Sequence, residues 1–388
     1  MGKTVSLKLL VAELIERQGW NPKQVTWTAF DTLRTLDQAE SHLVAIEDQY
    51  KPKLLLIDEV TSVIGWQRVI KKLRDDGTLA GACVILTGSS AHDLKAGAER
   101  MAGRRGDIPN PDRVLLPMSF PEFRRQTARH NVECSDYLKV GGFPFRVEGF
   151  LRKRVGYGEP WSEFDGFQIF DDVLFYEFAR RKLDRSIALE VMGRLSAVGA
   201  GALSYEAFAK PLSVAKDTAR KYLDALGDAF LLATISSYDT ARARVAPKKG
   251  RKFVWIDSAL GYSGQWLRSG PAVSEASMAE FAVGTELLRR FEARIWEGLS
   301  APRNVFTWKS SGGNEVDFLV VDRSQKLLFP VEVKWRNQLS DWDFQVIERA
   351  FGRGWIVTPR TGRKRPKAEA MGLSEFFERS LPGERRST

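Results

Sequence analysis

The chain has 388 residues, of which 43% are hydrophobic and 28% are charged. This composition excludes a disordered chain and a collagen-like fibre, and the length predicts two or three domains. No uninterrupted apolar stretch reaches the ~18 to 20 residues of a membrane helix, and charged residues interrupt the opening segment where a secretory signal would be apolar. We therefore expect a cytoplasmic protein without a membrane segment.

The charge balance and the few metal-binding side chains narrow the function further. The formal net charge is +10 and the isoelectric point is near 9.5, which favours a polyanionic partner because a basic surface displaces counterions from phosphates. Ordinary solubility charge is the alternative. Two cysteines and three scattered histidines support neither a disulfide framework nor a zinc site. A metal would therefore be held by carboxylates and would be Mg²⁺-like.

The first third of the chain alternates amphipathic and uniformly apolar segments. The expected elements, in chain order, are a helix over residues 6–18, a strand over 25–29, a buried strand over 53–59, a helix over 66–75 and a buried strand over 83–88. Buried strands that alternate with helices at this spacing predict a parallel α/β sheet.

The middle of the chain is helical. The periodicity predicts three short helices over residues 187–198, 204–209 and 215–225, followed by an apolar segment over 229–235. Three tightly spaced helices and a strand are typical of a winged helix-turn-helix, with Arg220 and Lys221 on or beside the exposed face of the recognition helix. The alternative is a packing module that has kept only the shape.

Basic residues concentrate just after this helical region. Residues 241–252 contain no acid but hold Arg242, Arg244, Lys248, Lys249, Arg251 and Lys252. A second basic cluster lies at 360–367. Charge runs are often solvated loops, but two of them on a basic chain predict contact with nucleic acid, and we favour double-stranded DNA.

The N-terminus resembles the second half of a phosphate-binding loop, G-x-x-x-x-G-K-[ST]. Gly2-Lys3-Thr4 leads directly into a helix. In such a loop the glycine lets backbone amides face the phosphates, the lysine neutralises the β and γ groups, and the hydroxyl coordinates Mg²⁺. The first glycine and its strand would lie upstream of Met1, so we expect the chain as it stands to bind ATP weakly.

Two neighbouring strands supply the rest of a nucleotide site. Leu54-Leu55-Leu56-Ile57-Asp58-Glu59 has the form of a Walker B strand, in which Asp58 would hold Mg²⁺ and Glu59 would polarise the attacking water. The run over residues 84–90 ends in small polar groups, and Ser89 is the residue expected to contact the nucleotide. Each run alone could be a buried strand with a capped end, but their order favours a nucleotide site.

Further motifs follow along the chain, and together they carry a family resemblance. They are Gly2-Lys3-Thr4, 54–59, Gly65-Trp66, 85–90, 101–104, 116–123 (LPMSFPEF), 141–144 (GGFP) and 257–260 (DSAL). This order resembles the bacterial and archaeal predicted AAA+-type ATPases that carry a C-terminal domain of unknown function. Arg104 matches the arginine of the family's Ala-Gly-Arg position, which implies a contact with nucleotide phosphates.

The resemblance implies three domains in an α/β chain. They are a P-loop NTPase core over 1–150 that lacks its first strand and half of its phosphate loop, a helical winged-helix domain over 151–240, and a nuclease-like domain over 241–388. AAA+-type cores often form rings and related ATPases also act as monomers, so both states are compatible with the resemblance.

The last domain contains a second cluster of charged residues. Residues 314–320 and 327–335 are expected to be strands, and period-two alternation places Glu332 and Lys334 on one face, where antiparallel pairing can bring Asp317 beside them. Two carboxylates that hold Mg²⁺ and a lysine that positions or activates water suit a metal-dependent phosphodiesterase. The alternative is an ordinary hairpin with solvated charges.

The same cluster resembles the PD-(D/E)xK core of restriction-endonuclease-like proteins. Asp317, Glu332 and Lys334 match its motif, and Glu286, on a helix expected over 279–293, matches the acid that precedes it. The resemblance implies that the three acids are metal ligands and that Lys334 is catalytic.

These observations lead to one main expectation and two alternatives. We expect an ATP-binding and ATP-hydrolysing AAA+-type protein that acts on or near DNA, with ATP and Mg²⁺ as cofactors. The first alternative is a Mg²⁺-dependent DNA nuclease whose ATPase half is regulatory or degenerate. The second is a non-enzymatic module that binds nucleic acid.

Overall fold

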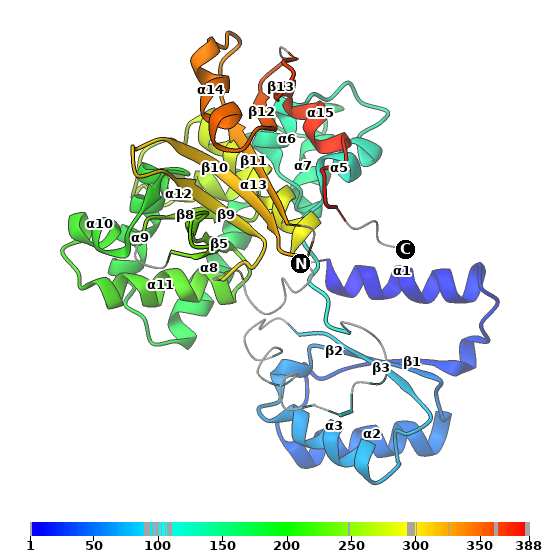
Figure 1. The fold of residues 1–388 in the computed structure, drawn as a ribbon. Helices are drawn as coiled ribbons and strands as arrows, with labels where there is room; N and C mark the ends of the chain where they lie inside the picture. The colour runs from blue at the N-terminus through cyan, green and yellow to red at the C-terminus, as the bar shows by residue number, and fades with distance from the viewer. Residues whose placement is uncertain are drawn as a thin grey trace. The chain divides into compact units, whose positions relative to one another are not determined.

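A computed structural model describes residues 2–88, 111–246, 249–292, 301–324, 326–360 and 364–384, with the single residues 94, 97, 101, 103, 104, 106 and 299. The chain divides into two compact units, Met1–Leu115 (unit 1) and Leu116–Thr388 (unit 2). The division comes before the expected boundary at residue 150, because the segment after residue 115 packs into the core of unit 2. Figure 1 shows the elements of both units.

Unit 1 is an α/β layer structure. Its elements are α1 (Lys3–Glu16), β1 (Val25–Ala29), α2 (Leu36–Tyr50), β2 (Leu54–Asp58), α3 (Trp66–Asp75) and β3 (Cys83–Leu86). The strands form a parallel sheet in the order β1-β2-β3, with Ala29 opposite Asp58 and Ile57 opposite Leu86. The expected parallel sheet is therefore present.

The central strand β2 explains how the layers are held together. All five of its residues are buried. Leu54 and Leu56 pack on one face with Leu7 of α1, whereas Leu55 and Ile57 pack on the other face with α2 and α3. Alternate side chains of a strand point to opposite faces, so a continuous apolar run requires cover on both sides. Figure 1 shows α1 on one side of the sheet, with α2 and α3 on the other.

Unit 2 begins with helices. They are α5 (Phe120–Gln126), α6 (Cys134–Val140), α7 (Pro144–Arg154), α8 (Phe167–Arg180) and α9 (Arg185–Val198). A small sheet follows, made of β4 (Ala202–Leu203), β5 (Leu232–Ile235) and β8 (Arg251–Trp255), with α10 (Tyr205–Ala209) and α11 (Lys216–Asp228) between the first two strands. Its order is β4-β8-β5, and both pairings are antiparallel. Between β5 and β8 lies a short hairpin of β6 (Tyr238–Asp239) and β7 (Arg244–Val245).

The C-terminal part of unit 2 is a mixed five-stranded sheet. Its elements are α12 (Ser263–Trp266), α13 (Glu275–Phe291), β9 (Val305–Lys309), β10 (Glu315–Asp322), β11 (Leu327–Val333), α14 (Asp341–Ala350), β12 (Gly354–Thr358), β13 (Ala368–Gly372) and α15 (Leu373–Glu378). The order is β13-β12-β11-β10-β9; the β9/β10 and β10/β11 pairs are antiparallel, and the β11/β12 and β12/β13 pairs are parallel.

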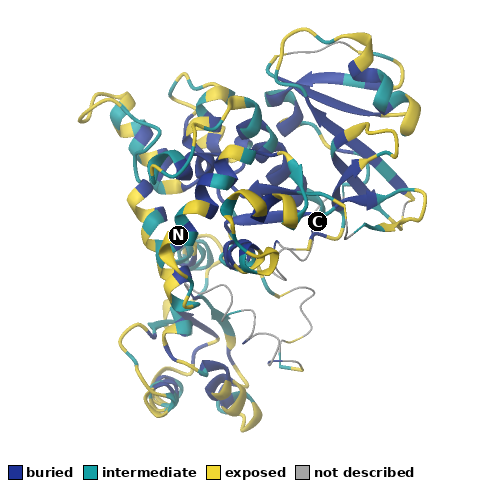
Figure 2. Ribbon diagram, turned by 90° about the vertical axis from the view of Figure 1, so that its left-hand side faces the viewer, coloured by how far each residue is buried: buried dark blue, intermediate teal, exposed yellow. Residues whose placement is uncertain are grey.

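The largest hydrophobic core of unit 2 joins its helices to its sheets, and two smaller clusters lie beside β9 and α14. It extends from Phe120 in α5 through α8, α11 and β8 to Leu381, and Figure 2 shows buried segments both in the strands and in the helices around them. A buried polar contact adds to this connection, because the Asp257 carboxylate accepts a 2.7 Å hydrogen bond from the backbone N–H of Gly142. The boundary expected at residue 240 therefore does not separate two cores.

Candidate functional site

In unit 1, the predicted phosphate-binding and metal-binding residues lie together at the carboxyl end of the sheet. Thr4, in the first turn of α1, donates a 2.7 Å hydrogen bond from Oγ1 to Asp58 Oδ2 at the end of β2. Lys3 Nζ lies 2.5 Å from the backbone oxygen of Gly88, just beyond β3. Gly2 precedes the helix with a φ of 84°, a left-handed conformation that glycine adopts without strain.

The Asp58 carboxylate is buried but well supplied with donors. Its Oδ1 accepts hydrogen bonds from the Thr87 hydroxyl and from the backbone N–H of Glu59. Burial acts to raise the pKa of Asp58, but the bonds from Thr87, Thr4 and Glu59 outweigh it, so the pKa lies below its usual value. Asp58 is thus held as a carboxylate anion at neutral pH, which is the form that binds a metal.

Lys3 lies in the same electrostatic environment. Burial lowers the pKa of Lys3 from its usual value, while the nearby charges of Glu59 and Asp58 act to raise it. The predicted Glu59 is therefore close enough to influence Lys3. Its own backbone is left-handed, with a φ of 49°, directly after β2. Such a conformation is uncommon for a residue other than glycine, and it occurs often at functional sites.

Three other residues belong to the predicted nucleotide site or lie next to it. Arg104 makes two hydrogen bonds to the Asp75 carboxylate at the end of α3, at 2.5 and 2.8 Å. In this structure its guanidinium is thus engaged with α3, and a contact with phosphate would require that pair to open. Ser89 lies outside the described residues. Thr87, which belongs to the predicted polar run over 84–90 but was not singled out there, is the residue that reaches Asp58 from the end of β3.

In unit 2, the predicted Asp317, Glu332 and Lys334 also lie together. Asp317 on β10 is opposite Glu332 on β11; its backbone N–H donates to Glu332 Oε2 at 3.0 Å, and its own Oδ2 accepts from the N–H of Val333 at 2.8 Å. Lys334 Nζ is 2.6 Å from Glu332 Oε1. The antiparallel pairing and the shared face of Glu332 and Lys334 are as expected.

The acid of α13 that lies with Asp317 is Glu280, not the predicted Glu286. Glu280 and Asp317 both contact the ammonium of Lys252. Glu286 is ion-paired with Arg290 at 2.6 Å and with Arg289 at 3.3 Å on its own helix. The two acids are six positions apart, which corresponds to a rotation of about 240° around the helix, so they lie on different faces.

Gly284 shows which face of α13 meets the sheet. A Cβ atom on Gly284 would lie 2.9 Å from the ring of Phe318, the neighbour of Asp317. Residues one helical turn apart share a face, so Glu280 belongs to the face that Gly284 marks. In the sequence, the glycine four residues after Glu280 was the signal that could have predicted which of the two acids faces the sheet.

Lys252 corrects the predicted nucleic-acid surface. It was grouped with the basic run over 241–252, but it is only 4% exposed. Its Nζ lies 2.5 Å from Asp317 Oδ1 and 2.6 Å from Glu280 Oε2. It is a buried ion-pair partner, because β8 is the middle strand of its sheet and turns Lys252 toward β10 and α13. We call the set of Lys252, Glu280, Asp317, Glu332 and Lys334 the acidic centre.

The electrostatics of the acidic centre reflect its burial. Burial raises the pKa of Glu332 to about 7, helped by the charge of Asp317 and opposed by Lys334. Burial likewise raises the pKa of Glu280 to about 7, again helped by Asp317 and opposed by Lys252. Within the described part of the chain, no group of three or more His, Cys, Asp or Glu side chains is arranged to hold a metal ion.

Of the other described residues predicted to bind nucleic acid, all are exposed except Arg251, which is half-buried. Arg220 and Lys221 are exposed on α11, and Arg220 pairs with Asp224 at 3.3 Å. Arg242, Arg244 and Lys249 are exposed in the segment between β5 and β8. The guanidinium of Arg251 lies over the Tyr205 ring, 3.9 Å from its centroid, and Lys248 lies outside the described residues.

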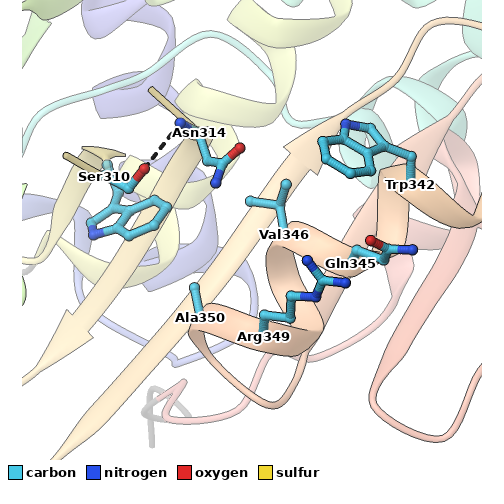
Figure 3. A pocket seen from close by; sticks show the side chains of 8 residues that line it. Ser310, Asn314, Trp342, Gln345, Val346, Arg349 and Ala350 are labelled. Atoms are coloured by element: carbon cyan, nitrogen blue, oxygen red, sulfur yellow. Dashed lines mark hydrogen bonds between the residues drawn. The ribbon is translucent and has the colours of Figure 1, made fainter. Parts of the chain in front are cut away.

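A pocket of about 230 Å³ lies beside α14 in unit 2. Trp342, Gln345 and Arg349 line it from the helix, Trp308 lines it from β9, and Asn314 lines it from the β9/β10 connection. Figure 3 shows these side chains, with the hydrogen bond from the Asn314 backbone to the Ser310 hydroxyl. The residues that line this pocket are not among the predicted site residues. Among the helices that the structure describes, none combines the length and the apolar composition of a membrane span.

Comparisons with known proteins identify an AAA-type domain at the N-terminus of the chain. Residues 1–124 match a family profile described as an AAA domain, so the chain carries an AAA-type domain at its N-terminus. The chain is 26% identical over 316 residues to an uncharacterized protein of Haemophilus influenzae, covering 74% of this chain and 72% of that protein. It is 24% identical over 294 residues to an uncharacterized protein of Methanocaldococcus jannaschii, covering 66% and 58%. No solved structure matches the chain.

Proposed function

We propose that unit 1 binds ATP with Mg²⁺ and hydrolyses it, and that unit 2 holds this ATPase on or near double-stranded DNA. The convergence of Lys3, Thr4 and Asp58 at the carboxyl end of the sheet carries the first part. Ligands of open α/β sheets bind at this end of the strands. The AAA-type domain over residues 1–124 supports the same function.

The residues present fit a magnesium nucleotide. The Thr4 hydroxyl and the Asp58 carboxylate are hard oxygen ligands within 2.7 Å of each other, and Mg²⁺ prefers such ligands in combination with phosphate oxygens. When bound, the ion would neutralise the charge of the β- and γ-phosphates. Thr4 and Asp58 would hold it from the protein side.

Lys3 and Glu59 would have separate roles. The charges of Glu59 and Asp58 already act on Lys3, and its ammonium would move from the Gly88 carbonyl to the phosphates. Glu59 follows the metal ligand directly, and its carboxylate would orient the attacking water and accept its proton. The protein thus supplies charge, a metal-binding pair and a base within one short region.

A titration of the chain with a nonhydrolysable ATP analogue and Mg²⁺ tests this assignment. Lys3→Ala should abolish the binding heat, because it removes the charge that faces the phosphates. Lys8→Ala is the matched control, since Lys8 is exposed on the same helix and lies over the Trp27 ring. Equal affinities for the native protein and Lys3→Ala would refute the site.

The order of elements in unit 2 supports the DNA-binding part of the proposal. Helix α9, strand β4, helices α10 and α11, and strands β5 and β8 follow one another as in a winged helix-turn-helix. Helix α11 then has the place of the recognition helix, and the β6/β7 hairpin has the place of the wing. The exposed Arg220 and Lys221 lie on α11, and the exposed Arg244 lies in the hairpin.

Salt-dependent binding to a DNA duplex tests this surface. Removing one basic side chain that binds a phosphate should flatten the slope of log affinity against log salt by about 0.9. We therefore expect Arg242→Glu, Arg244→Glu and Lys249→Glu, combined in one protein, to reduce both affinity and slope. Lys51→Glu, Lys71→Glu and Arg152→Glu, also combined, change the net charge equally at other exposed positions. An unchanged slope in the first protein, or the same reduction in both, would contradict the proposal.

A further inference from the structure

Lys252 is held rigidly inside the acidic centre. Strand β8 pairs on both sides at this position, with Ala202 of β4 and with Ile235 of β5. The side chain is 4% exposed, and its ammonium also lies 5.1 Å from the centroid of the Phe318 ring. Because both neighbouring strands fix the backbone, the ammonium has a defined place between β10 and α13.

The carboxylate oxygens around this ammonium already have partners. Asp317 Oδ1 binds Lys252 and Oδ2 accepts from the N–H of Val333. Glu332 Oε1 binds Lys334 and Oε2 accepts from the N–H of Asp317. All four oxygens of the two strand acids are thus engaged by protein donors. A metal ion would have to compete with a buried charge already bound there.

We propose that the Lys252 ammonium occupies the cation position of the acidic centre, so that the native centre assembles without a divalent metal. Removal of that ammonium is expected to create a site for an ion of the Mg²⁺ or Mn²⁺ class. This inference concerns unit 2 alone and does not depend on ATP binding by unit 1.

The geometry explains why an ion could take the place of the ammonium. Asp317 Oδ1 and Glu280 Oε2 lie 2.5 and 2.6 Å from the same Nζ atom. Without Lys252, these two oxygens would point at one vacant position with no buried positive charge between them. Uncompensated buried carboxylates are costly, and hard oxygen ligands bind Mg²⁺ or Mn²⁺.

The test is an electron paramagnetic resonance titration with Mn²⁺, in which bound ions lose the signal of the free ion. Every protein carries Asp58→Asn, so that unit 1 does not contribute a metal ligand. We expect no Asp317-dependent binding in this background and a gain of one bound Mn²⁺ per chain when Lys252→Met is added. Lys309→Met, which breaks an exposed ion pair with Glu315 in the same unit, should gain none.

Further variants keep the result interpretable. Adding Asp317→Asn to Lys252→Met should remove the gained ion. The proposal would be overturned if the background protein bound Mn²⁺ and lost it when Asp317→Asn was added, whether or not a DNA duplex was present. A folded Lys252→Met protein that binds no ion would overturn it as well. If Lys252→Met does not fold alone, Mn²⁺ should restore its circular dichroism, and failure to do so would also overturn the proposal.

Discussion

The sites of unit 1 and unit 2 use similar residues in different ways. Each places an aspartate of a sheet strand, Asp58 or Asp317, near a lysine. In unit 1, hydroxyl groups bind the carboxylate and Lys3 Nζ is directed to a backbone carbonyl. In unit 2, the buried ammonium of Lys252 binds the partly buried carboxylate directly.

This difference shows that a motif of acids and lysines does not by itself predict whether the acids bind a metal ion. Hydroxyl donors hold Asp58 in place without neutralising it, so its negative charge is available to a metal ion. Lys252 neutralises Asp317 inside the protein. The arrangement of donors around a carboxylate, rather than the presence of the carboxylate, therefore separates a metal-binding site from a structural ion pair.

The largest expected effect concerns hydrolysis in unit 1. Glu59→Gln should retain binding of the ATP analogue but reduce the rate of phosphate release by about 10²- to 10⁴-fold, because it removes a proton acceptor and leaves the metal-binding pair. Asp48→Asn, at an exposed position on α2, is the control. A hydrolysis rate that survives Glu59→Gln would assign the base to another residue.

The next effect concerns the stability of unit 2. Lys252→Met should lower the free energy of unfolding by up to about 3–5 kcal/mol in urea denaturation, because it leaves the partly buried carboxylates of Asp317 and Glu280 without their buried partner. Lys309→Met, which breaks an exposed pair, should cost about 0–1 kcal/mol. If the two substitutions cost the same, the ion pair of Lys252 does not stabilise the native state more than an exposed pair does.

A smaller effect is expected where α13 packs on the sheet. Gly284→Ala should cost about 1–3 kcal/mol, because its Cβ would lie 2.9 Å from Phe318 and 3.0 Å from Val254. Gly149→Ala is a matched control inside α7, with no atom within 4 Å of the added Cβ. It should be stabilising by about 1 kcal/mol, because alanine favours a helix. Reduced stability in both would indicate that close packing is not the cause.

The last expected effect is a pH dependence. Because burial and Asp317 raise the pKa of Glu332 from 4.5 to about 7, the folded protein takes up a proton in this range that the unfolded chain does not. The stability that this proton contributes is complete below pH 4.5 and is lost as the pH rises through about 7.

A comparison of variants isolates this contribution. The free energy of unfolding of the native protein should fall with rising pH by up to about 1.4 kcal/mol per unit more than that of Glu332→Gln. Glu315→Gln, at an exposed position of β10, should follow the native curve. Parallel curves for the native protein and Glu332→Gln would show that Glu332 does not bind a proton on folding.

The sequence predicted most of the local structure. The continuous apolar run of β2 and the periodic helix α3 were predicted within a residue of their bounds, because burial on both faces and helical periodicity leave direct patterns. The pairing of Glu332 with Lys334 followed from strand alternation. The partition into domains was not predicted, because one core joins α5 and β8 through contacts between distant segments.

The composition of the acidic centre was only partly predictable. Lys252 belongs to a basic run, and its burial depends on the central place of β8 in a sheet whose other strands lie far away in the sequence. The choice between Glu280 and Glu286 depends on the rotation of α13 about its axis. Both are set by tertiary packing, which a single charged residue does not reveal.

Counting bound Mn²⁺ in the presence of the ATP analogue tests the contrast between the two sites most directly. The native protein should bind one Mn²⁺ per chain. Asp58→Asn should lose that ion, and Asp317→Asn should retain it, because Asp58 is available to a metal and Asp317 is neutralised by Lys252. Loss of the ion in Asp317→Asn together with its retention in Asp58→Asn would contradict both assignments.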